Sequence, residues 1–224
     1  MWGQNFLWLP IGLVSASLAT AVGPRLVAAR SAGEAGHAAG RRDSEGALVL
    51  ATAGLALSSA LLVGLGWPIA RLVAFGEATR DGFAPLAHTV VAFGLGLLGT
   101  GLMFFVVRIM FSIDDARGAA ITTWILAVVG ILAMAICADV AQRSDRAPAL
   151  AVGFGVAHVV GAVIMVVRYS RVSGWLRWRS CARPMASSVV AGAVCAVLLL
   201  IGIDSFPTSR VGALCAIVVG TAAA

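Results

Sequence analysis

The sequence contains no lysine, and charged residues of any kind are scarce. All 16 basic residues are arginine, and only 12% of the 224 positions are charged. Soluble domains carry about a quarter charged residues, so this composition excludes an ordinary water-soluble fold. Without lysine, no glycine-rich loop can present the lysine of a phosphate-binding P-loop. The formal charge of +6 does not indicate nucleic acid, because the arginines are spread over several segments.

Cysteine is also rare, with four residues: Cys137, Cys181, Cys195 and Cys215. Their spacing fits no metal site, and we expect them to pack as small residues without a disulfide framework. The sequence also lacks a Ser/His/Asp grouping and a pair of carboxylates inside an apolar run. We therefore predict that the protein is not an enzyme and uses no cofactor or metal.

Long apolar runs, in contrast, dominate the chain, which is 60% hydrophobic with a mean hydropathy of +0.99. Runs such as Ala47–Trp67 and Thr89–Val107 reach the roughly 20 residues that cross a bilayer as a helix. We predict an all-α, polytopic membrane protein with six to seven spans in a single domain, residues 1–224. The expected spans are about 2–23, 46–67, 83–109, 119–138, 147–167, 185–203 and 211–224, the last being short for a span.

The arginines predict the orientation of these spans. Eleven lie after the first, third and fifth spans, against five after the second, fourth and sixth. Positive loops stay in the cytoplasm, so the first set is expected there. The first span then enters from outside, without the basic region of a signal peptide. Such a start is typical of a piece of a longer transporter.

A few polar residues are candidates for function, each with a structural alternative. His158 is the ionisable residue near the middle of a span, and it either senses protonation or is a neutral imidazole bonded to a neighbouring helix. Arg108, Asp115 and Arg117 form either a gate or an ordinary turn with a helix cap and local ion pairs. Trp175, Arg177, Trp178 and Arg179 alternate aromatic and cation, which favours anchoring among anionic headgroups over substrate binding.

Two motifs carry a resemblance to a known family. Leu9-Pro10-Ile11-Gly12-Leu13, with Ala19–Leu26 and Gly33-Glu34 after it, is similar to the signature of the eighth helix of the MurJ/MviN lipid II flippases. Arg108–Ser112 with Asp114–Arg117 resembles the turn between helices ten and eleven of that family, which belongs to the MOP exporter superfamily. The chain thus resembles helices eight to fourteen, the second lobe of the fourteen-helix fold.

The resemblance implies a function. It implies a lobe facing a central cavity, through which an undecaprenyl-pyrophosphate-linked peptidoglycan precursor crosses the bacterial cytoplasmic membrane by alternating access. It also implies a partner lobe that precedes this chain or is supplied separately, and a lipid-tail groove at the last two spans. Asn5 stands where the family often has a cavity arginine, and Arg25 follows the conserved proline of the first motif.

The residues to test for a substrate path or gate are therefore Asn5, Arg25, Arg108, Asp115, Arg117 and His158. Two alternative functions remain open. One is export of another lipid-linked polysaccharide by the same superfamily. The other is a non-transporting membrane scaffold for cell-wall synthesis, which the departures from the family pattern favour somewhat. Lipid-linked precursor and anionic lipids are the expected partners, and nucleic acid is not.

Overall fold

The computed structural model describes residues 2–73, 83–142 and 145–203, with isolated positions 217 and 221. Within these residues every regular element is a helix, and six helical segments are long and apolar enough to span a membrane. The prediction of an all-α polytopic membrane protein is thus confirmed. The expected span 211–224 falls almost wholly outside the described residues.

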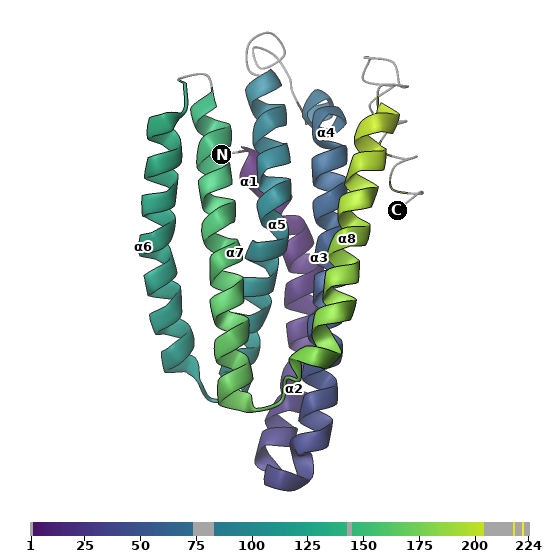
Figure 1. The fold of residues 1–224 in the computed structure, drawn as a ribbon, viewed down its shortest axis with the longest axis vertical. Coiled ribbons are helices and arrows are strands. Elements are labelled where there is room, and N and C mark those ends of the chain that lie inside the picture. The colour runs from purple at the N-terminus through teal and green to yellow at the C-terminus, as the bar shows by residue number, and fades with distance from the viewer. Residues whose placement is uncertain (1, 74–82, 143–144, 204–216, 218–220, 222–224) are drawn as a thin grey trace.

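The helices run up and down, nearly parallel to one long axis (Figure 1). The first spanning segment combines α1 (Trp2–Pro10), a π-helical turn η1 (Ile11–Ala16) and α2 (Ser17–Ser31). A 3-10 turn, η2 (Gly33–Gly36), leads to α3 (His37–Gly64) and the short α4 (Gly66–Val73). The remaining helices are α5 (Phe83–Ser112), α6 (Ala116–Val140), α7 (Arg146–Ser173) and α8 (Trp178–Ile203).

Helix α5 lies at the centre of the bundle, because its glycines let other helices approach closely. Two-thirds of its most apolar stretch is buried, against 17% for α6 and 6% for α8. A β-carbon at Gly96 would stand 2.6 Å from the Cα of Gly155 in α7, closer than such atoms approach in proteins. The helix is continuous, so its glycines serve close packing and not local unwinding.

The first span is longer than its sequence suggests. Pro10 lacks an N–H and its ring crowds the preceding turn, and the π-helical turn that follows it keeps the segment helical. In this turn the buried Ser15 hydroxyl donates to the carbonyl of Gly101, at 2.9 Å. The helix then continues past Pro24 to Ser31, so most of the polar stretch from Arg25 to Glu45 belongs to two long helices.

Large apolar side chains cover the outside of the outer helices. On α6, Trp124 is 76% exposed and Val140 is 81% exposed, and α8 shows a similar run. Such surfaces are stable only against lipid or another apolar protein surface. The protein is therefore a multi-pass membrane protein.

Candidate functional site

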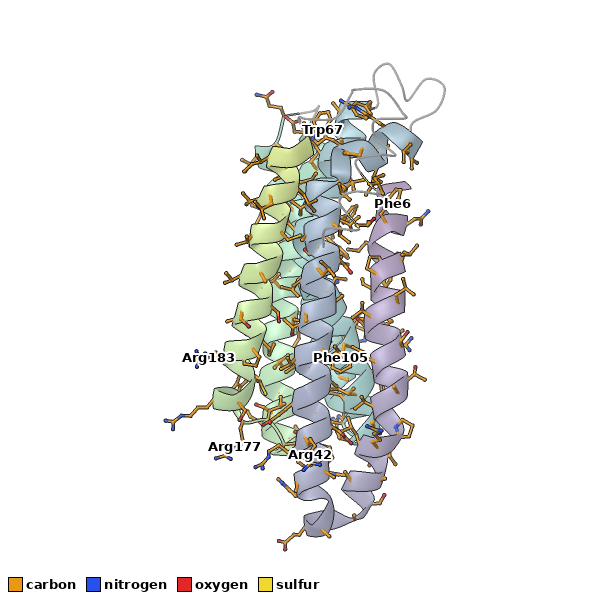
Figure 2. All side chains as sticks on the ribbon, turned by 90° about the vertical axis from the view of Figure 1, so that its right-hand side faces the viewer. Phe6, Arg42, Trp67, Phe105, Arg177 and Arg183 are labelled. Atoms are coloured by element: carbon orange, nitrogen blue, oxygen red, sulfur yellow. The ribbon has the colours of Figure 1, made fainter. Side chains whose placement is uncertain are left out.

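Three connections gather at one end of the bundle, and we call this the arginine-rich end. They are the hairpin of α2 and α3, the turn between α5 and α6, and the link between α7 and α8 (Figure 1). Figure 2 shows Arg42, Arg177 and Arg183 at this same end, with Trp67 at the other. The structure thus brings together the loops that the sequence assigns to one side of the membrane.

The whole formal charge of the protein is concentrated at this end. Eleven arginines and five carboxylates lie in its three connections or in the adjoining parts of the helices, and the five arginines and five carboxylates elsewhere in the sequence cancel. Most of the eleven guanidiniums are exposed, among them Arg30, Arg42, Arg171 and Arg179. Such a surface attracts phosphate groups, whether of lipids or of a lipid-linked substrate.

The best-defined polar contact at this end joins Asp115 to Arg168. The Nε of Arg168 donates to Asp115 Oδ2 at 2.8 Å, and its Nη2 donates to Oδ1 at 2.9 Å. Asp115 also caps α6, because its Oδ1 accepts the N–H of Gly118 at 3.2 Å. Gly118 is required here, since a β-carbon at that position would overlap the guanidinium. The pair thus fixes the α5–α6 turn to α7.

This contact also fixes the charge of Asp115. The hydrogen bond from Arg168 and its positive charge lower the pKa of the carboxyl below its ordinary value of 3.8, and partial burial opposes them only in part. Asp115 is therefore an anion at neutral pH and is already neutralised by its partner. Its expected role as a helix cap is seen, but its ion pair is not local, because Arg168 lies 53 residues away.

Trp175 lies inside the protein, where the anchoring hypothesis does not fit it. Its side chain is only 3% exposed, and its ring covers Gly40. The same ring meets the ring of His37 edge-to-face, with the two centroids 6.4 Å apart. Next to it, the Arg177 N–H donates to Glu45 Oε1 at 3.0 Å, which ties the α7–α8 link to α3. Trp178, in contrast, is 45% exposed, and the side chains of Arg177 and Arg179 are exposed.

The other expected gate residues are open to their surroundings. The Arg108 guanidinium lies over the ring of Phe104, 4.7 Å from its centroid, and is exposed. The Nη1 of Arg25 stands 3.7 Å from Asp43 Oδ1, which is an ion pair too long for a hydrogen bond, and the arginine side chain is 70% exposed. Arg117 is exposed, and no ion pair to it is found among the described residues. Arg108 and Arg117 can therefore bind an anionic ligand without breaking an ion pair among the described residues, whereas Arg25 would share it with Asp43.

His158 and Asn5 lie away from the arginine-rich end. The Nδ1 of His158 lies 2.8 Å from the carbonyl oxygen of Phe154, one turn back in its own helix, not in a neighbouring helix. The ring lines a cavity of about 320 Å³ among α5, α6 and α7, walled mainly by apolar groups such as Met103, Leu126 and Met134. Asn5 is exposed on α1.

Sequence reasoning missed Arg168 and Tyr169 as structural residues. The Tyr169 hydroxyl is 2.7 Å from the hydroxyl of Ser44 in α3, and both residues are buried. Tyr169 is the sole tyrosine of the chain, a signal that could have drawn attention to it. Nothing in the sequence indicates that Arg168, and not a neighbouring arginine, pairs with Asp115.

No cluster of three possible metal ligands occurs within the described residues. In the comparison with known proteins, the family model described as "Lipid II flippase MurJ" matches residues 1–220. Neither the curated proteins nor the solved structures yield a match.

Proposed function

The chain belongs to the lipid II flippase MurJ family, and from this membership we propose that it is one lobe of a transporter for lipid-linked peptidoglycan precursor. The lobe works in the bacterial cytoplasmic membrane, with its arginine-rich end in the cytoplasm, and alternates access with a second helical lobe. The family match over residues 1–220 is the observation that carries this proposal.

Two features of the structure support a substrate with a phosphate headgroup and a long lipid tail. Arg25 and Arg108 are exposed at the end that bears the net positive charge, where they can bind phosphate oxygens. An apolar cavity of about 650 Å³ lies between α3 and α8, lined by side chains such as Leu57, Val194 and Leu198. Such a groove suits a hydrocarbon chain.

The test follows lipid II across the membrane in cells depleted of their own flippase. The full gene product that contains this chain is supplied, and the fraction of lipid II on the outer surface is measured. We expect the wild type to restore exposure of lipid II, and Arg108→Gln to lower it about ten-fold or more, because the charge-assisted contact of the guanidinium with a phosphate group is lost. The matched control is Arg30→Gln, because Arg30 is an exposed arginine near the tip of the α2–α3 hairpin.

The other candidate functions give different results. If the protein is a scaffold of cell-wall synthesis, lipid II should stay inside the cell even when the protein is present at its normal level. Cells that carry Arg108→Gln should then grow as well as cells that carry the wild type. An exporter of another lipid-linked polysaccharide would expose that polymer and not lipid II. Either result contradicts the proposed function.

A further inference from the structure

Three side chains form a ladder along the face where α1 meets α5. The ring of Trp8 meets the ring of Phe104 edge-to-face, with centroids 6.0 Å apart. The guanidinium of Arg108 also lies over the Phe104 ring, with its central carbon 4.7 Å from the ring centroid. Phe104 and Arg108 are four residues apart on one helix, so they share a face, and the Arg108 side chain leans back toward Phe104.

Packing against buried side chains holds the ring of Phe104 in place. It is partly buried and packs against the core cluster that includes Leu7, Ile11 and Leu97. The hydrogen bond from Ser15 to the Gly101 carbonyl holds the first span against α5 three residues earlier in that helix. Trp8 then closes the outer side of the ring, with 45% of its own surface still exposed. Phe104 is therefore a rigid support for Arg108.

Arg108 itself is charged, exposed and without an ion pair among the described residues. A free arginine side chain loses much rotational freedom when it binds an anion. An aromatic face attracts a guanidinium within about 6 Å of its centroid and restricts it before the anion arrives. Such preorganisation lowers the entropy lost on binding and strengthens the contact.

We propose that Phe104, braced by Trp8, is a positioning residue that holds the Arg108 guanidinium ready for a phosphate group of the transported lipid. This inference rests on the proposed function, because it takes the phosphate to be that of the lipid-linked precursor. Phe104 acts through Arg108 and does not itself need to touch the phosphate.

The test measures the affinity of the purified full gene product for lipid II. Phe104→Leu keeps an apolar side chain but removes the aromatic face, and we expect affinity to fall about two- to five-fold. Phe104→Tyr keeps the face and should restore most of it. Phe111→Leu is the matched control, since Phe111 is an exposed aromatic of the same helix with no ring contact among the described residues.

A double variant separates positioning from general support of the fold. In an Arg108→Gln protein, Phe104→Leu should cause no further loss of affinity, because the group that it positions is absent. Equal losses in both backgrounds, or no loss in either, would overturn the inference. Trp8→Leu, at an exposed position, provides a second variant if Phe104→Leu does not fold, and it should show the same dependence on Arg108.

The outcomes also distinguish this inference from the proposed function. If Arg108→Gln abolishes transport but Phe104→Leu binds lipid II as tightly as the wild type, the positioning role is wrong and the transporter stands. If the wild type neither binds nor exposes lipid II, the proposed function itself is wrong.

Discussion

At the scale of single residues, two adjacent aspartates have different roles. Asp114 is exposed and has a φ of 65°, in the left-handed region, where it completes the turn after α5. Asp115 caps α6 and pairs with Arg168 through two hydrogen bonds. The backbone of the turn decides which carboxylate faces α7, so the two residues should respond differently to mutation.

We expect Asp115→Asn to destabilise the purified protein by about 1 kcal/mol, whereas Asp114→Asn should have little effect. The asparagine can still cap α6, but the charge-assisted pair with Arg168 is lost. Arg168 is 39% exposed, so solvent screening limits the loss. Thermal unfolding in detergent measures both variants. A larger loss for Asp114→Asn would contradict this assignment.

The pH dependence of this contribution follows from the pKa of Asp115. Because Arg168 lowers that pKa in the folded protein, the stabilisation is fully present above the ordinary value of 3.8 and is lost as the pH falls through the lower folded pKa. The difference in stability between wild type and Asp115→Asn should therefore be constant from neutral pH to about pH 5.

At the scale of the elements, α3 holds the α7–α8 link through one side of its first turns. Gly40 faces Trp175, and a β-carbon there would lie 2.7 Å from the indole ring. Gly46, six positions later, faces open space. Glycine is therefore needed at position 40, where the indole ring packs against the helix, and can be replaced at position 46.

We expect Gly40→Ala to displace Trp175 and to lower stability by about 1–3 kcal/mol, because a rigid, buried ring cannot move aside cheaply. Gly46→Ala is the control and should be neutral or slightly stabilising, since alanine favours the helix. Cys181, 1% exposed near the start of α8, reports the displacement. Its labelling by a maleimide, located by mass spectrometry, should rise in Gly40→Ala alone.

At the scale of the whole molecule, the six spanning segments place three connections, each flanked by arginines, at one end (Figure 1). If the protein crosses the membrane as proposed, cysteines introduced at Arg42 and Arg177 should be labelled from the same side. Arg71→Cys, in α4 at the other end of the bundle, should be labelled from the opposite side. Labelling of the first two positions from opposite sides would contradict both the topology and the proposed role as a transporter lobe.

Much of this architecture could be read from the sequence. Apolar runs of span length must form helices in lipid, because only a helix satisfies its own backbone polar groups there. The uneven distribution of arginines indicates which loops share a side. The ends of the helices were less predictable. Helix α2 continues through polar residues to Ser31, and α3 begins among polar residues at His37, because the two helices pack against each other beyond the apolar stretch.

The contacts of the candidate site were predicted less completely than the fold, and the physical reason differs from residue to residue. Arg108 and Asp115 lie in a recognisable motif, but their partners Phe104 and Arg168 are defined by packing between helices. Trp175 stands within a run of tryptophans and arginines that resembles an interfacial anchor. Its burial depends on Gly40, 135 positions earlier, which no local pattern reveals.

The sequence by itself determined that this chain forms helices in a membrane, because hydrocarbon admits few other structures, and its motifs indicated the family. Only the tertiary structure decided which of eleven arginines are engaged and which are free, and which aromatic rings are buried. Those outcomes depend on contacts between residues far apart in the chain, where a single missing β-carbon or a turn of helix determines which side chains meet.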